Sequence, residues 1–221
     1  MARSPIATSA FTGTDSNPPI DFTALNAGDG QLTIDTNRVE STTSFGSTDA
    51  NDSRWTGSGT FTAEQYAKIT VTGISNPGGI NKMGVILRAS ADTGAGRDLY
   101  RVYYLEDNTS AIVIQKILDG TPTQLDSTNV GTFANGDTVE GEIEEITGTT
   151  TIRSYHNGAL IATVTDTSSP ITATGAPGVC GAVGFGPGLF GDDWEAGNLA
   201  AAASAYVSPI THPLTRTALR M

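Results

Sequence analysis

The fold class of this chain is decided by the stretch TTIRSYHNGALIATV at residues 150–164. Two runs rich in β-branched, aromatic and aliphatic residues flank the pair Asn157-Gly158. A two-residue type I′ turn needs positive φ at both central positions, and Asn followed by Gly meets that need at the lowest steric cost. The stretch therefore predicts a β-hairpin, and it contains no arrangement of reactive groups.

Alternating segments continue the β pattern on the N-terminal side of this hairpin. Residues 66–73 carry apolar side chains at every second position, which is the period of a half-buried strand. Residues 138–146 alternate in the same way before a polar turn, so we expect one face of each strand to be buried. In the second segment the inward positions are Val139, Gly141 and Ile143, and the outward positions are Glu140, Glu142 and Glu144.

About a dozen short strands at spacings of roughly 8–12 residues are indicated along the chain, as in a sandwich or barrel. Residues 55–61 are predicted as strand after a polar loop at 44–53, and residues 83–89, apolar on both faces until Arg88, as a central strand. Asp119-Gly120 marks a further hairpin. No helix–strand alternation appears, so the sequence predicts an all-β fold and excludes a parallel α/β sheet.

Composition narrows the classes of function. The chain has 221 residues, 26 Gly, one Cys and a formal net charge of −11. It is long enough for a core without disulfides, and Cys180 is expected to be buried as a small apolar residue. Strong negative charge disfavours nucleic-acid binding. No apolar run reaches about 20 residues and no signal-peptide core is visible, so we expect neither a membrane span nor Sec export.

The order of several short motifs resembles the concanavalin A-like, laminin G-like jelly-roll domains. More narrowly, it is similar to the versions found in bacteriophage virion proteins. The resemblance covers about residues 6–197 and implies an antiparallel jelly-roll sandwich of two sheets, one of them concave. Members bind glycans or serve as structural modules, and some jelly rolls are glycosidases. The motifs are FTGTD (11–15), RW (54–55), EQYAKITVT (64–72), GVILRAS (84–90), YRV (100–102), VEGEIEEI (139–146), YHNG (155–158) and DDWE (192–195).

This resemblance suggests a non-enzymatic structural protein of a phage-like virion. We expect an N-terminal arm at residues 1–5, a sandwich at 6–197 and a C-terminal arm at 198–221. The arms would attach a capsid decoration protein, or a tail or head-fibre component, to the major capsid protein or to copies of itself. The expected location is then the virion. The assembly residues predicted in the C-terminal arm are Tyr206, Pro209, His212, Arg216 and Arg220.

A carbohydrate-binding, lectin-like module is the alternative function. Tyr and Trp rings offer an apolar face and a polar tip, which suits stacking on sugars. The same residues also serve as core or cross-strand pairs. The candidate glycan-binding residues are Trp55, Tyr100 and Tyr104.

A third possibility is catalysis by Glu140, Glu142 and Glu144, because jelly-roll glucanases carry a similar acidic triplet on one strand. Alternate strand residues lie about 6.6–7 Å apart on one face, whereas retaining glycosidases need carboxyls about 5–5.5 Å apart. The competing interpretation is the solvated face of an amphipathic strand. His156 lies in a turn and is expected to be exposed. We therefore predict that the protein is not an enzyme.

Metal binding is expected to be weak or absent. One Cys and two scattered His cannot form a zinc site. Calcium takes oxygen ligands from loops, but Asp and Asn also cap turns by bonding to their own backbone. We expect no cofactor and leave calcium open. The candidate calcium ligands are Asp49, Asn51 and Asp52 in one loop and Asp192 and Asp193 in another.

Overall fold

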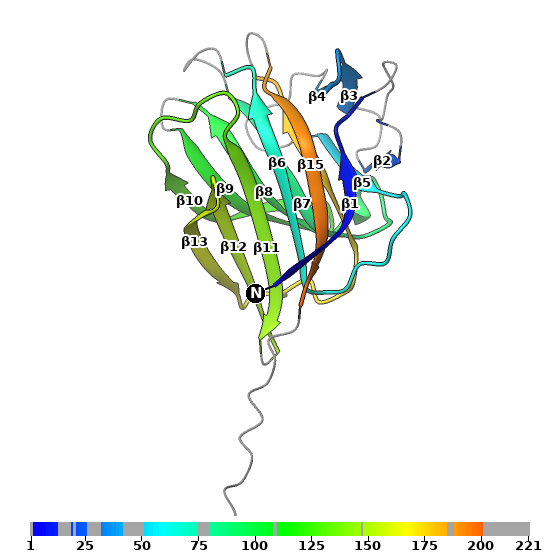
Figure 1. Ribbon diagram of the computed structural model, residues 1–221. Coiled ribbons are helices and arrows are strands. Elements are labelled where there is room, and N and C mark those ends of the chain that lie inside the picture. The colour runs from blue at the N-terminus through cyan, green and yellow to red at the C-terminus, as the bar shows by residue number, and fades with distance from the viewer. Residues whose placement is uncertain are drawn as a thin grey trace, which may run out of the picture.

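The computed structural model describes residues 2–12, 19, 21–25, 32–41, 51–74, 80–107, 110–146, 148–184 and 188–200. In this part of the chain two antiparallel β-sheets pack face to face (Figure 1). The only helical element among the described residues is a 3₁₀ turn, Gly94–Gly96. The all-β, two-sheet jelly-roll sandwich predicted from the sequence is confirmed. No helix in the described residues is both long and apolar enough to cross a membrane.

The sheet nearer the viewer in Figure 1 is called the front sheet, and the other the back sheet. Each strand pairs antiparallel with its neighbours, as expected for a meander of hairpins and longer connections. The front sheet has the order β13 (Ala159–Asp166), β12 (Thr149–His156), β11 (Thr138–Ile146), β6 (Gln65–Thr72), β15 (Phe190–Leu199), β4 (Arg38–Ser41) and β3 (Leu32–Asp35), and β1 (Arg3–Ser9) also pairs with β15. The back sheet has the order β10 (Thr121–Asn129), β9 (Ala111–Leu118), β8 (Leu99–Glu106), β7 (Asn81–Ala89), β14 (Ala176–Ala182), β5 (Asn51–Trp55) and β2 (Phe22–Ala24).

The core fills the space between the two sheets. Alternate residues of the strands point inward and form one cluster, which includes Ile69, Val102 and Ile143. The sheets approach so closely at Gly141 that an added Cβ would lie 2.8 Å from Val102 Cγ2 and 3.1 Å from Leu87 Cδ1. A glycine inside a strand is thus required here by packing rather than by backbone conformation.

The local sequence signals are confirmed by the structure. The hairpin between β12 and β13 turns at Asn157 and Gly158, whose φ angles are 50° and 76°. The hairpin at Asp119-Gly120 is present between β9 and β10. All nine residues of β7 are buried, as expected for a central strand. Cys180 is fully buried, and burial raises the pKa of its thiol to about 12.

Two strand assignments from the sequence are wrong. Strand β5 begins at Asn51, inside the segment expected to be a polar loop, and ends at Trp55, where a strand was expected to start. The polarity of this segment predicts a solvent-exposed loop, but Asn51 and Asp52 are buried and have hydrogen-bond partners. Asn51 Nδ2 donates to Ser41 Oγ at 2.7 Å. Asp52 Oδ1 accepts from Arg101 Nε at 2.7 Å.

The first and last strands of the described chain, β1 and β15, lie side by side. Residues 3–5, assigned to an N-terminal arm from the sequence, are the first residues of β1 and pair with the end of β15. The strands touch at Gly197, where an added Cβ would lie 2.1 Å from Ser4 O. Strand β15 continues to Leu199, beyond the expected boundary at residue 197. The predicted assembly residues Tyr206, Pro209, His212, Arg216 and Arg220 lie outside the described residues.

Candidate functional site

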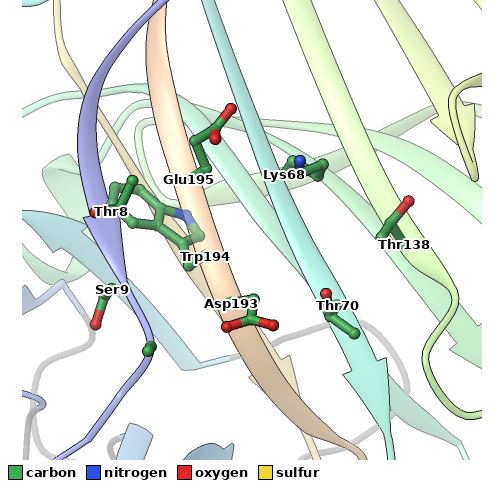
Figure 2. Close-up of a pocket in the computed structure, with 9 residues that line it drawn as sticks. Thr8, Ser9, Lys68, Thr70, Thr138, Asp193, Trp194 and Glu195 are labelled. Carbon is green, nitrogen blue, oxygen red and sulfur yellow. The ribbon is translucent and has the colours of Figure 1, made fainter.

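The outer face of the front sheet contains a polar groove with a volume of about 370 Å³. Four neighbouring strands contribute to it: β1, β15, β6 and β11. Figure 2 shows Lys68 between Glu195 on one side and Thr138 on the other. We call this cavity the β6–β15 groove. Its lining residues are Thr8, Ser9, Ala10, Lys68, Thr70, Thr138, Asp193, Trp194 and Glu195.

A β-bulge in β15 shapes one side of the groove. Asp192 pairs with Thr70 and Glu195 pairs with Lys68, so three steps along β15 match two steps along β6. The extra residue is accommodated with Asp193 in the left-handed region, at φ 46°. Trp194 points into the core, where its Nε1 donates to Gly178 O at 3.1 Å. The bulge therefore leaves two acidic residues of β15, Asp193 and Glu195 on either side of Trp194, along the groove. Bulges often re-aim side chains in this way next to binding sites.

Lys68 is the basic residue of the groove. Its cross-strand neighbours are Glu195 on β15 and Glu140 on β11. Both carboxylates are engaged elsewhere, because Tyr66 OH donates to Glu195 Oε1 at 2.8 Å and Arg3 binds Glu140. No hydrogen bond or ion pair joins Lys68 Nζ to another residue of the described chain. Its ammonium group is available to a ligand in the groove.

Beside the groove, Arg3 binds the acidic strand β11. Arg3 Nη1 donates to Glu140 Oε2 at 3.0 Å, and Arg3 Nε donates to Glu142 Oε1 at 3.1 Å. The guanidinium carbon lies 5.3 Å from the ring centre of Tyr66 and 5.7 Å from that of Tyr155. This combination of charge-assisted hydrogen bonds and ring contacts holds the start of β1 on the face of the sheet.

The outward positions of β11 are not solvated, contrary to one interpretation of the sequence. Glu140, Glu142 and Glu144 are 2%, 5% and 1% exposed. Burial raises the pKa of Glu140, although the charge of Arg3 acts in the opposite direction. Glu144 forms an ion pair with Arg153. Each of the three carboxylates therefore faces a guanidinium. Arg3 binds both Glu140 and Glu142, the two carboxylates that a glycosidase mechanism would need to be accessible to substrate.

The three predicted glycan-binding aromatic residues do not line the groove. Tyr100 is fully buried, and its OH donates to Asp166 Oδ2 at 2.7 Å. Tyr104 is 2% exposed, and its ring centre lies 4.0 Å from that of Phe133. Both are residues of the core.

Trp55 is partly buried and belongs to an aromatic cluster behind the groove. Its ring stacks on Trp194 with centres 5.4 Å apart and meets Phe22 edge to face at 5.2 Å. Trp55 thus supports Trp194, which does line the groove, through packing. The alternation over residues 66–73 leaves Lys68 and Thr70 on the face opposite the apolar positions, but nothing local in the sequence indicates that β1 and the bulge enclose them.

His156 is also less exposed than its turn position suggested. Its side chain is 16% exposed, and Nε2 lies 2.9 Å from Asp137 Oδ2. The imidazole stacks on Phe133 with ring centres 4.5 Å apart. The contacts of His156 with Asp137 and Phe133 hold the β12–β13 hairpin against the loop before β11.

Three of the candidate calcium ligands, Asn51, Asp52 and Asp192, have other partners in the structure. The carboxylate of Asp52 is bound by Arg101 and lies 3.3 Å from Arg97 Nε. Asp192 Oδ1 accepts the N–H of Asp193 at 2.8 Å, a bond to the adjacent backbone at the bulge of β15. Asp49 lies outside the described residues. Within the ranges that the structure describes, no three His, Cys, Asp or Glu side chains gather closely enough to hold a metal ion.

Comparisons with known proteins agree on the fold. No protein-family model matches the chain, and no curated protein matches it by sequence. A Bacillus subtilis protein of unknown function with a galectin-like fold is similar in structure, with a TM-score of 0.60 and 11% identity over 88% of this chain and 96% of that one. A glycosidic hydrolase gives 0.55 and 12% identity over 89% and 96%. Legume-type lectins also share the fold.

A phage protein shares the architecture as well. The CBM2 module of Lactobacillus casei BL23 phage J-1 evolved Dit has a TM-score of 0.52 and 13% identity, covering 90% of this chain and 97% of that module. At these identities the similarity defines the class of fold, a concanavalin A-like jelly roll of the kind found in lectins and galectins. Because a hydrolase has the same fold, activity must be argued from the groove itself.

Proposed function

We propose that the protein is a carbohydrate-binding module and that the β6–β15 groove is its glycan site. The observation that carries this proposal is a concave surface lined by polar groups with different hydrogen-bonding roles. Lys68 supplies donors, Asp193 and Glu195 supply acceptors, and threonine hydroxyls supply both. A sugar presents closely spaced hydroxyls that both donate and accept, so it can satisfy such a mixed lining.

The size and position of the groove support this proposal. Its volume of about 370 Å³ lies within the range of about 300–1,000 Å³ that is usual for small-molecule sites. It opens on the front sheet, at the bulge of β15, rather than in the packed core. Asp193 keeps a left-handed backbone conformation there. Non-glycine residues in such conformations are frequent at binding sites.

Binding without hydrolysis fits the neighbouring acidic strand. A retaining glycosidase uses one carboxyl as nucleophile and a second as acid and base. Here Glu140 and Glu142 are both hydrogen-bonded to Arg3, and Tyr155 OH donates to Glu142 Oε2 at 2.5 Å. A substrate would have to displace these partners before reaching either carboxyl. We therefore infer a non-enzymatic module.

The proposal is tested by glycan-array binding of the full chain, followed by calorimetry with the best ligand. Asp193→Ala and Thr70→Val should each weaken binding by about tenfold, which corresponds to about 1.4 kcal/mol and to the loss of one or two hydrogen bonds. Thr163→Val is the matched control, because Thr163 is exposed on β13 at the far edge of the same sheet. An array without any specific binding would contradict the proposal.

A second candidate function is a structural role in a phage-like virion, favoured by the similarity to a module of a phage protein. Under this proposal the module sits on the particle as a decoration protein or in a tail or head fibre, and residues 201–221 attach it to the major capsid protein or to copies of itself. Glycan binding and attachment are compatible, since the groove residues and residues 201–221 are different parts of the sequence. Deleting residues 201–221 should release the protein from particles and leave its thermal unfolding unchanged. Full occupancy on particles after that deletion would contradict attachment through this segment.

A further inference from the structure

We propose that the preferred ligand of the β6–β15 groove is a saccharide with a single anionic substituent, which pairs with Lys68. This inference rests on the proposed glycan-binding function and adds a ligand class to it. The shared chemistry is a negatively charged oxygen group on an otherwise uncharged glycan. A uronic or sialic acid carboxylate, a sulfate ester and a phosphate ester all provide it.

The charges that face Lys68 come from both neighbouring strands. Asp193 and Glu195 lie on β15, and Glu140 lies on β11. Alternating charges on adjacent strands usually neutralise one another by cross-strand pairing. In the described chain neither Glu195 nor Glu140 forms a close ion pair with Lys68. Glu195 Oε1 accepts from Tyr66 OH, and Glu140 is held by the Arg3 guanidinium.

Lys68 therefore keeps its three N–H donors for the groove. No described residue accepts a hydrogen bond from Nζ or forms a close ion pair with it, and the charge of Lys68 acts on Glu140 only at longer range. A charged ligand oxygen forms a shorter and stronger hydrogen bond with an ammonium group than a neutral hydroxyl does. A ligand with one anionic group gains this interaction, and its remaining hydroxyls can donate to Asp193 and Glu195.

The same charges argue against polyanions. Asp193 is exposed at the groove, Glu195 is beside it, and the whole chain has a net charge of −11. A densely charged polymer such as heparin would place further anions near these carboxylates, and like-charge contact opposes its approach. The structure thus favours an isolated acidic residue over a repeating acidic polymer.

The experiment is an NMR titration of the full ¹⁵N-labelled chain with matched probes. These are methyl glucoside against methyl glucuronide, lactose against 3′-sialyllactose, and glucose against glucose 6-sulfate and glucose 6-phosphate, with heparin as the polyanion. At least one acidic probe should bind about tenfold more tightly than its neutral partner, with shifts at β6 and β15. The preference should shrink as salt is raised, because the new ion pair is partly screened.

Lys68→Met should remove this preference, and Lys68→Arg should retain part of it. Arg38→Gln removes a cation on β4, which pairs with β15 only at Phe190 and Gly191, and Arg38 does not line the groove, so this variant should change nothing. A preference that persists in Lys68→Met, or tighter binding of neutral probes or heparin by the wild type, would overturn the inference while leaving glycan binding intact. No binding of any probe, together with an empty glycan array, would overturn the proposed function itself.

Discussion

Arg3 is joined to Glu140 across 137 positions of sequence, with Arg3 Nη1 donating to Glu140 Oε2 at 3.0 Å. The same guanidinium also binds Glu142, so one residue of β1 is hydrogen-bonded to two nearly inaccessible carboxylates of β11. Between these strands lie β15 and β6. The contact therefore fastens the start of the chain across the face of the front sheet, next to the groove whose wall includes Thr8 and Ser9.

Arg3→Ala should destabilise the protein by about 2 kcal/mol, because two buried carboxylates lose their charged donor. The partial exposure of Arg3 keeps this below the cost of breaking a fully buried pair. Urea denaturation followed by fluorescence measures the change. In the Glu140→Gln, Glu142→Gln background the same substitution should cost clearly less, since no buried charge is then left unpaired. Equal costs in the two backgrounds would show that the ion pairs do not hold β1.

Trp55→Ala should lower stability and leave ligand preference unchanged. Trp55 contributes to the core through Trp194 and Phe22, and it does not line the groove. Loss of its ring should cost about 3 kcal/mol, at the low end for aromatic truncation because the residue is only partly buried. Thermal unfolding measures the change in stability, and the glycan array measures the ligand preference. Selective loss of glycan binding in a variant of wild-type stability would instead make Trp55 a sugar platform.

The sequence could predict what depends on neighbours along the chain. The hairpin at Asn157-Gly158 and the inward positions of β11 follow from turn chemistry and alternation, and both are confirmed. The outward glutamates were expected in solvent because Arg3, which covers Glu140 and Glu142, lies 137 and 139 positions away from them in the sequence. The groove likewise depends on a bulge at Asp193 and on the pairing of β1 with β15. Such long-range contacts leave no periodic signal.

Aromatic residues illustrate the same limit. Tyr100 and Tyr104 share one face of β8, and alternation cannot say whether that face points to solvent or to the opposite sheet. The structure turns it toward the core, where Tyr100 OH accepts the N–H of Ile171 at 3.0 Å. A tyrosine with both its ring and its hydroxyl satisfied inside the protein has no surface left for a sugar. Only the packing of the two sheets decides this outcome.

Acid should weaken the tie between Asp137 and the β12–β13 hairpin. The net effect of the fold is to lower the pKa of Asp137. Burial alone would raise it, but hydrogen bonds from Asn157, the Ala134 N–H and His156 have the larger combined effect. A lowered pKa in the folded state adds stability above the unfolded pKa of about 3.9, and this stability is lost as pH falls through the folded value.

Asp137→Asn should therefore reduce stability at pH 7 and flatten its decline below about pH 4. Thermal unfolding between pH 2 and 7 measures this, with Asp92→Asn as the control at an exposed position. If Asp137→Asn and the wild type lose stability in parallel on acidification, the carboxylate of Asp137 makes no such contribution.

Gly141→Ala should test how tightly the sheets are pressed together under the acidic strand. The new methyl group would lie 2.8 Å from Val102 Cγ2, well inside normal contact distance, and Val102 is fully buried on β8. Either the sheets move apart or Val102 changes rotamer, and both cost about 1–3 kcal/mol in a packed core.

Gly96→Ala is the matched control, because its added Cβ would meet Asp92 Cβ at an ordinary 3.6 Å. The midpoint of urea unfolding should fall for Gly141→Ala and stay near the wild-type value for Gly96→Ala. Since β11 also carries Glu140 and Thr138, a shifted strand should weaken ligand binding as well, which would link the spacing of the sheets to the shape of the groove.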